Sequence, residues 1–389
     1  MGSKHWFVIL FISAIHFTSF SHRMDVVPFF IELKEVYQAG YTEIGGLISA
    51  FLLGYAFFQI PAGTLADRRS PRVLICAGLV TMLVASFLFV ISHSLPVSLI
   101  LRFIMGAAAA MIFSPGIKLI SMVTPKEKRG ISIGILEGAA GMGMLLTLTV
   151  FPILSSVVSW RYLFFVLSLM ILAYLLLFWK LPGVNHQQET AFTSGKVSFS
   201  QIFRNTKVLR LLGISFFGLF GLYSYLAWFP TYLQTVAGYS KQESGWIMAV
   251  VMIAQVVMAP VSGRISDWLG NRKIVLVIGS GLLLFSALWL LAFHHYAIYL
   301  IALLVGTGIS WSMAPMLTLA TEIVSLQTAG LVISVVNTVG QIGSALSGIL
   351  FGMLFDAAGS FYGIWLSCAA AFAVRILICL GDLEERGVA

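Results

Sequence analysis

The sequence predicts an all-α integral membrane protein whose twelve spanning helices form two related six-helix halves. Three observations support this fold class: long apolar runs, short basic clusters between them, and a loop pattern that occurs twice. The 389 residues are 59% hydrophobic and only 10% charged, with a mean hydropathy of +0.98. Soluble domains carry about 25% charged residues. This composition therefore excludes a soluble domain.

Apolar runs of about 20 residues, long enough to cross a hydrocarbon core of about 30 Å, mark the helices. The first run continues towards Pro28 without a small-residue cleavage site, so we expect it to be retained as a helix. In chain order, the expected spanning helices are 6–30, 44–65, 73–92, 97–122, 131–154, 161–181, 208–233, 245–266, 274–292, 297–320, 330–354 and 362–380.

The positive charges orient these helices. With the amino terminus in the cytoplasm, most Lys and Arg residues, Arg375 among them, fall at the inner face. Only Lys34, Arg161 and Lys241 fall at the outer face, as the positive-inside rule requires. We therefore expect a multi-pass protein with both termini in the cytoplasm. Because the chain is compact, the bacterial inner membrane is the expected location, and a eukaryotic membrane is the alternative. The lipid bilayer is an expected partner, whereas nucleic acid is not, because the basic residues are scattered topology signals.

One long polar stretch divides the chain. Residues 182–207 contain Pro182, Gly183 and several Ser, Thr and Gln residues, and lie between the sixth and seventh apolar runs. This composition is typical of a linker. The expected domains are a six-helix bundle at 1–181, a cytoplasmic linker at 182–207 and a second six-helix bundle at 208–389.

The repeated loop pattern follows the second helix of each half. Residues 63–72 read Gly-x-Leu-x-Asp-Arg-x-x-x-Arg, and residues 263–273 repeat the pattern in weaker form. Two six-helix halves with such loops resemble the major facilitator superfamily, in which the loop Asp pairs across the halves and locks one state. The alternative is a solvated loop that only sets topology. The residues to which this resemblance assigns gating are Asp67, Arg68, Arg72, Asp267 and Arg272.

Two arginines fall inside spanning helices, where a charge costs at least about 2.5 to 3.5 kcal/mol and normally faces a cavity or a partner. Arg23 and Arg102 lie at similar depth in the outer halves of the first and fourth helices. Two guanidinium groups facing one cavity repel unless an anion lies between them, and both suit bidentate capture of a carboxylate or phosphate. Alternatively, Arg23 snorkels to the outer interface, and Arg102 belongs to a pattern common to many facilitators.

The surrounding residues narrow the resemblance. Arg23 and Pro28, the glycine-rich run 45–63 and the run Trp-Phe-Pro-Thr-Tyr-Leu at 228–233 are similar to the anion:cation symporter family. That similarity implies an anion site lined by Arg23, Tyr55 and Arg102. The sequence departs from the family at two positions. His22 stands where an Asp commonly precedes the arginine, and Ala109 stands where many members have a proton-coupling Glu.

Protons are the expected coupling ion, with candidates in the first half only. His22 titrates near neutrality when unperturbed. Asp25 follows Arg23 by two residues and is therefore expected on another face of the helix. Lys118 and Glu137 lie at matching depth in the hairpin of the fourth and fifth helices, so we expect them to pair. The pair could be structural, or Glu137 could take up a proton during transport.

The second half supplies polar and aromatic candidates for the same cavity. Asn337 and Gln341 are four residues apart and therefore share one helix face. Each candidate could serve instead as a contact between helices. The candidate substrate-binding residues of this half are Tyr225, Trp228, Trp311, Asn337 and Gln341.

Together these features predict a monomeric secondary transporter that moves a small organic anion, of the carboxylate or sugar acid class, by alternating access with proton-coupled uptake. The alternative is a proton-coupled exporter or exchanger of a metabolite or an amphipathic drug, which the small-residue run 134–143 supports. An enzyme is not expected, since the chain lacks His-Glu-x-x-His and Gly-x-Ser-x-Gly patterns. No catalytic residue, metal ligand or cofactor is expected either, and three cysteines give no metal spacing.

Overall fold

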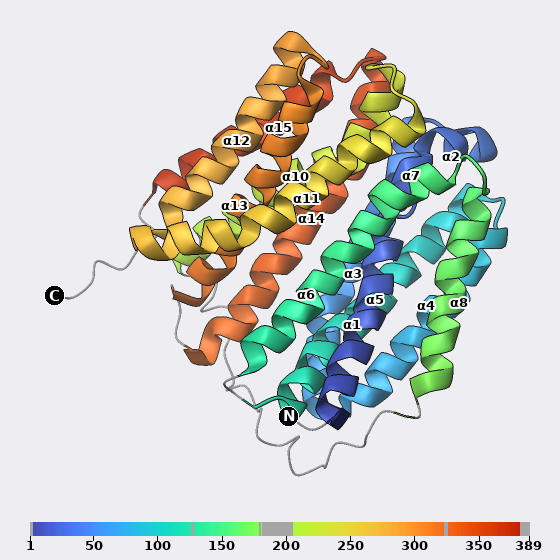
Figure 1. Ribbon diagram of the computed structural model, residues 1–389, viewed down its shortest axis with the longest axis vertical. Coiled ribbons are helices and arrows are strands. Elements are labelled where there is room, and N and C mark those ends of the chain that lie inside the picture. The colour runs from blue at the N-terminus through green and yellow to red at the C-terminus, as the bar shows by residue number, and fades with distance from the viewer. Residues whose placement is uncertain (1–2, 126–127, 179, 181–204, 323–325, 382–389) are drawn as a thin grey trace. The chain divides into compact units, whose positions relative to one another are not determined.

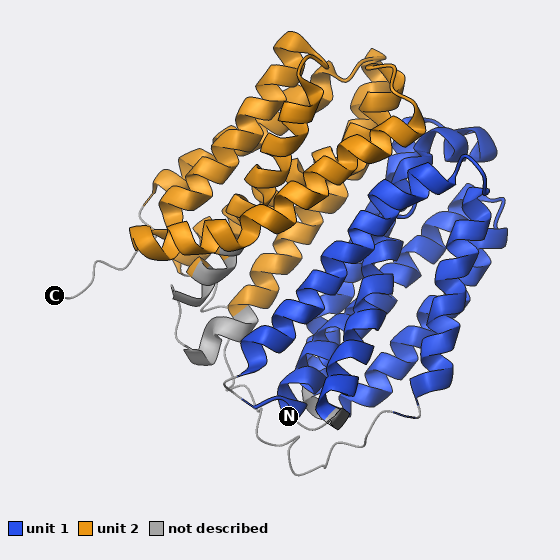
Figure 2. Ribbon diagram, in the orientation of Figure 1, with its two compact units in different colours: residues 1–193 blue, residues 194–389 orange. Residues whose placement is uncertain are grey.

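The computed structural model describes residues 3–125, 128–178, 180, 205–322 and 326–381, and within those ranges the chain is helical without a strand (Figure 1). Two compact units divide it, Met1–Thr193 and Ser194–Ala389 (Figure 2). The boundary falls inside the predicted linker 182–207, most of which lies outside the described residues. Each unit is described by itself.

Unit 1 contains the first six spanning stretches. Two of them are interrupted: α1, η1 and α2 form one stretch, and α6, η3 and α7 form another. The elements are α1 (Ser3–Met24), the 3-10 turn η1 (Val27–Phe29), α2 (Phe30–Tyr37), α3 (Tyr41–Arg68), α4 (Pro71–Ile91), α5 (Leu95–Val123), α6 (Arg129–Leu145), the π-helical segment η3 (Leu146–Val150), α7 (Phe151–Leu154) and α8 (Trp160–Phe178).

Unit 2 contains α10 (Thr206–Thr235), α11 (Lys241–Leu269), α12 (Arg272–Phe293), α13 (Ile298–Glu322), α14 (Leu326–Ala358) and α15 (Tyr362–Leu380). Across the described residues, 11 helices are long and apolar enough to cross a membrane, and α13 adds the shorter apolar helix Ile298–Ser312. The predicted all-α membrane fold, and the order of its apolar helices, are confirmed.

Local sequence signals set the ends of these helices. Ser240 and Glu243 form a reciprocal capping box at the start of α11, and Gly270 ends that helix with a positive φ of 59°. Asn271 caps the start of α12 by accepting from the backbone of Ile274. The tight turn between α11 and α12 therefore forms because Gly270 favours the end of one helix and Asn271 favours the start of the next.

Two glycines let α3 and α5 touch backbone to backbone. A Cβ at Gly54 would lie 2.0 Å from the carbonyl oxygen of Phe103, and one at Gly106 would lie 1.9 Å from that of Phe51. No side chain fits at either position, so the two helices approach as closely as small residues allow. This crossing places Arg102 of α5 directly against the first turns of α3.

Candidate functional site

Arg102 of α5 forms a buried hydrogen-bond network with the end of α1, and its side chain has no solvent exposure. Its Nη1 donates to the Asp25 carboxylate at 2.8 Å and to the backbone carbonyl of His22 at 2.7 Å. Its Nε donates to the carbonyl of Leu47 at 3.1 Å, and its Nη2 to that of Arg23 at 3.4 Å. The guanidinium therefore joins α1, α3 and α5.

The network forms there because α1 ends at Met24. The last carbonyls of a helix lack partners within the helix and carry the negative end of its dipole. Arg102 supplies donors to those carbonyls, and Asp25 supplies the opposite charge. The second carboxylate oxygen of Asp25 bonds His22 Nδ1 at 2.9 Å. The charges are thus paired and hydrogen-bonded, which a buried ion pair requires.

This geometry corrects the expectation that Arg102 and Arg23 face one cavity with an anion between them. The negative charge beside Arg102 belongs to the protein, because Asp25 already forms the ion pair. The spacing along the sequence correctly predicted that Asp25 lies on a different face from Arg23. It did not predict that the Asp25 carboxylate bonds Arg102 of α5. Arg102 holds the end of α1 in place.

Arg23 lies in a different setting, between two aromatic rings. Its Cζ is 4.3 Å from the centroid of Phe20 on α1 and 4.5 Å from that of Tyr55 on α3. The side chain of Arg23 is only 4% exposed, which does not fit the alternative of snorkelling to the interface. The structure therefore brings Arg23 and Tyr55 together, as the family resemblance implies.

A histidine that sequence reasoning missed extends this group. The ring of His16 stacks on Phe113 of α5 at 5.1 Å and meets Phe20 edge-on at 4.6 Å. Phe113 in turn lies 6.2 Å from Tyr55. The only sequence signal was spacing, since His16 precedes Arg23 by seven residues, or two turns, and so shares its face. We call His16, Phe20, Arg23, Tyr55 and Phe113 the aromatic cluster.

The predicted pair of Lys118 and Glu137 does not form. Lys118 Nζ donates to the carbonyl of Ala66 near the end of α3 at 2.6 Å, whereas Glu137 is exposed on α6. Matching depth did not fix the direction in which each side chain leaves its helix, and α5 packs far more extensively on α3 than on α6. Glu137 lies instead within electrostatic range of Arg23.

The predicted gating residues are only partly described. Asp67 and Arg68 belong to the last turn of α3, but their side chains lie outside the described part of the chain. Asp267 and Arg272 form an ion pair with each other, and Arg272 also donates to Ser266 Oγ at 3.1 Å. This pair is local to the turn between α11 and α12, and a gating role for it stays a prediction.

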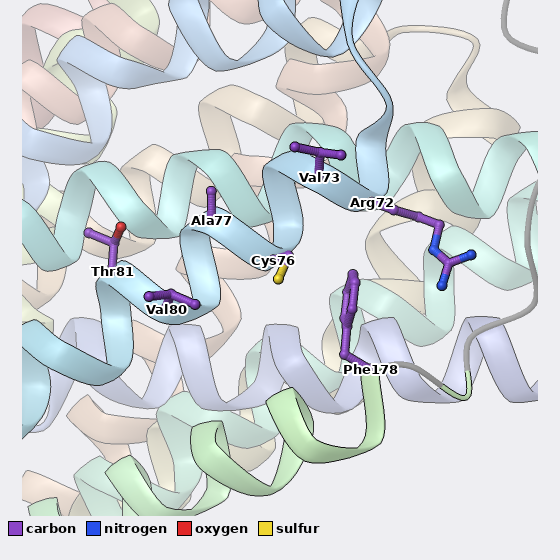
Figure 3. A pocket seen from close by; sticks show the side chains of 7 residues that line it. All are labelled: Arg72, Val73, Cys76, Ala77, Val80, Thr81 and Phe178. Carbon is purple, nitrogen blue, oxygen red and sulfur yellow. The ribbon is translucent and has the colours of Figure 1, made fainter.

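Arg72 lies at one end of a groove between α4 and α8 (Figure 3). Its Cζ is 5.8 Å from the ring of Phe178. The groove encloses about 750 Å³. Its other lining residues are almost all apolar or small: Val73, Cys76, Ala77, Val80 and Thr81. The side chain of Arg72 therefore lies against Phe178 of α8, in the same unit.

Two candidates in unit 2 belong to its packed interior. Tyr225 Oη donates to the carbonyl of Leu283 at 2.8 Å, and the ring stacks on Trp365 at 5.5 Å. Trp228 is fully buried as well. In this structure the Tyr225 hydroxyl bonds α12 and its ring has no exposure, so a substrate contact by Tyr225 or Trp228 stays a prediction.

The other candidates of unit 2 lie on α13 and α14. Gln341 Nε2 donates to Asn337 Oδ1 at 3.5 Å, so the two share one face of α14, as their spacing predicts. Trp311 is partly exposed, and its Nε1 has no hydrogen-bond partner among the described residues. A substrate contact by these three residues stays a prediction.

Arg375, predicted at the inner face as a topology signal, has packed partners within unit 2. It is fully buried there and donates to the Ser312 hydroxyl and, at 3.1 Å, to the Ser312 carbonyl. Gly218 of α10 makes room, since a Cβ there would lie 2.6 Å from the Arg375 Cζ. In the described chain no carboxylate pairs with Arg375.

Comparison with known proteins agrees with this architecture. The family model of the Major Facilitator Superfamily matches residues 7–348 and 237–387. A probable L-galactonate transporter of Escherichia coli is 24% identical over 70% of this chain and 65% of its own length. A probable galactarate/D-glucarate transporter of the same organism is 24% identical over 99% of this chain and 95% of its own. A crystal structure of a D-xylose-proton symporter matches with a TM-score of 0.81 at 15% identity, covering 98% of both chains.

The apolar helices of the two units and the match to this family together define a polytopic membrane transporter rather than an enzyme. The chain belongs to the Major Facilitator Superfamily. These two relatives are named as probable transporters of sugar acids, which agrees with the predicted similarity to anion symporters.

Proposed function

We propose that this transporter carries a small organic anion of the carboxylate or sugar acid class, and that Arg23 binds its carboxylate. The observation that carries the proposal is the position of the Arg23 guanidinium between Phe20 and Tyr55. Aromatic rings stabilise a cation through their faces, while the N–H donors of a guanidinium lie along its edge. This setting suits bidentate binding of a carboxylate.

The Arg102 network supports the assignment by contrast. Asp25 neutralises Arg102, so the anion site depends on one arginine rather than two. Because the network fixes the end of α1, Arg102 acts as a positioning residue for Arg23. The names of the sugar acid transporters among the relatives point to the same substrate class.

Thermal stabilisation of the purified protein tests the substrate class, because a ligand that binds only the folded state raises apparent stability. The panel contains monocarboxylates, sugar acids, phosphate esters and lipophilic cations. We expect one class of carboxylate to stabilise the parent and Arg264→Ala, whose arginine is exposed in unit 2, but not Arg23→Ala. Stabilisation by cations alone, or an unchanged response of Arg23→Ala, would favour the exporter alternative.

The coupling ion is the second part of the proposal: transport is uptake driven by protons, with His22 and Asp25 as the proton-binding pair. His22 Nδ1 bonds Asp25, and its Nε2 has no hydrogen-bond partner in the described part of the chain. A proton on His22 would be held by a hydrogen bond to Asp25, whose one negative charge would then be shared between His22 and Arg102. The distribution of Lys and Arg supports the further proposal that both termini lie in the cytoplasm, with the protein in the bacterial inner membrane.

Proteoliposomes separate binding from coupling. With an acidic exterior, the parent should accumulate the acid found in the stabilisation assay. His22→Gln should still exchange it but should no longer accumulate it, whereas His93→Gln, which changes an exposed loop histidine, should behave as the parent. Accumulation by His22→Gln at the rate of the parent would remove His22 from the coupling step.

A further inference from the structure

One face of α1 carries more polar groups than carboxylate binding uses. Ser13, His16, Phe20 and Arg23 are spaced three, four and three residues apart, so they form a stripe on a single helix face. Ser13 is 4% exposed and His16 is 1% exposed. Neither Ser13 Oγ nor His16 Nε2 has a hydrogen-bond partner among the residues that the structure describes.

Such groups are costly, because a buried polar atom without a partner loses about 1 to 3 kcal/mol of hydration. Neighbouring buried groups on α1 do find partners. Thr18 bonds the hydroxyl of Tyr174, and Ser21 donates to the carbonyls of Phe17 and Gly143. Ser13 Oγ and His16 Nε2 therefore remain as two unpartnered atoms on the stripe that ends at Arg23, whereas another such atom of α1, His22 Nε2, lies off this stripe.

The stripe is also short enough to serve one ligand. His16 and Arg23 contact the same ring, with the His16 ring 4.6 Å and the Arg23 Cζ 4.3 Å from the centroid of Phe20. Seven residues of α-helix rise only about 10 Å. A small acid whose carboxylate reaches Arg23 can therefore extend along Phe20 towards His16.

We propose that His16 and Ser13 recognise hydroxyl groups of the transported acid, so that the site selects hydroxylated carboxylates over their deoxy analogues. This inference rests on the proposed binding of the carboxylate by Arg23. A hydroxyl both donates and accepts, so it pairs with either tautomer of His16 and with the hydroxyl of Ser13. A site that hydrogen-bonds a substrate hydroxyl discriminates strongly against analogues without it.

Matched pairs of acids test the proposal by binding to the purified full chain. The pairs are glycerate and propionate, tartrate and succinate, and gluconate and hexanoate; each pair shares chain length and charge. Sorbitol, which has hydroxyls but no carboxylate, is the control ligand. We expect the parent to prefer the hydroxylated acid of its best pair by at least about 10-fold, and to bind sorbitol too weakly to measure.

His16→Phe keeps an aromatic ring, although a larger one, to stack on Phe113 and removes the polar nitrogens. We expect it to reduce the preference about 10-fold while binding the deoxy acid as the parent does, and we expect Ser13→Ala to reduce the preference about 3-fold. His93→Phe and Ser280→Ala are the controls. Ser280 is buried in unit 2 and bonded to its own helix.

The outcomes separate this inference from the proposed function. If no acid binds the parent, or if Arg23→Ala binds as the parent does, the proposed function and this inference both fail. If carboxylates bind through Arg23 but the preference survives in both His16→Phe and Ser13→Ala, only this inference is overturned. If thermal unfolding shows that His16→Phe is not folded, the preference for hydroxylated acids is measured in His16→Gln and Ser13→Ala instead.

Discussion

The Arg102 network and the aromatic cluster hold two buried arginines in one helical unit by opposite means. Arg102 donates to a carboxylate and three carbonyls, whereas Arg23 lies between the faces of two rings. The first arrangement supplies a negative charge from the protein itself. The second supplies ring faces, whose quadrupoles stabilise a cation without neutralising it, and the carboxylate of Glu137 lies within electrostatic range. An arginine within a spanning helix can therefore be held mainly by a direct ion pair, as Arg102 is, or lie between aromatic faces, as Arg23 does.

The largest expected effect tests the structural side of this contrast. Arg102→Met should lower the free energy of unfolding by about 3 to 5 kcal/mol, because Asp25 is left as a buried charge without its partner. Thermal unfolding in detergent measures the loss. The double variant with Asp25→Leu should recover part of it, since neither charge remains. An Arg102→Met protein that unfolds like the parent but loses ligand binding would place Arg102 in the anion site instead.

The helix crossing that supports both regions gives the next effect. Gly106→Ala should cost about 1 to 3 kcal/mol and weaken ligand binding, because the added Cβ meets the Phe51 carbonyl and forces α3 away from α5. Gly134→Ala on α6 is the matched control, since nothing lies within 4 Å of its Cβ position. Helix propensity predicts that this control is neutral or slightly stabilising. Equal losses in both variants would refute the role of the crossing.

Arg375 is a third buried arginine, and its removal can be compared with that of Arg102. Its partners are neutral, so Arg375→Met leaves no unpaired charge and should cost only about 1 kcal/mol, for the hydrogen bonds to Ser312. The same unfolding assay compares it with Arg102→Met. If Arg375→Met lowers the free energy of unfolding as much as Arg102→Met does, the unpaired charge of Asp25 is not the cause of the loss at Arg102.

The smallest effect concerns the ring beneath Arg23. Tyr55→Leu should weaken carboxylate binding by about 1 kcal/mol relative to Tyr55→Phe, because only the leucine variant loses the aromatic face. Calorimetric titration with the acid that binds the parent measures the difference. Identical affinities in the two variants would mean that the cation–π contact does not contribute to the site.

Features that depend on composition and on the spacing of apolar residues could be predicted from the sequence. Features that depend on the direction in which a side chain leaves its helix could not. Apolar runs and loop residues were enough for the helices, and the family resemblance placed Tyr55 beside Arg23. The partner of Arg102 was not predictable, because it depends on where α1 stops and how Asp25 turns there. Lys118 was misassigned for a similar reason, since depth along a helix does not give the angle around it.

His16 was overlooked for another reason. A single histidine in an apolar run is more often a packing residue than a ligand contact, and only its neighbours in space distinguish the two. Phe113, which comes from another helix 97 positions along the chain, provides the stack that identifies the cluster. The burial of Arg375 was not predictable for the same reason, because Gly218 of α10 makes room for it and Ser312 of α13 bonds it.

The π-helical segment Leu146–Val150 lies within the fifth span, Arg129–Leu154, and determines where that span can lose a residue. A π turn holds one residue more than an α turn, and one residue corresponds to about 100° of helix rotation. Deleting a residue within this segment would convert it to plain α-helix while leaving the flanking turns in phase. The same deletion in α6 would swing Gly143 out of its contact with Phe17. The fifth span is thus expected to accept a one-residue deletion at 146–150 and to reject it one turn earlier.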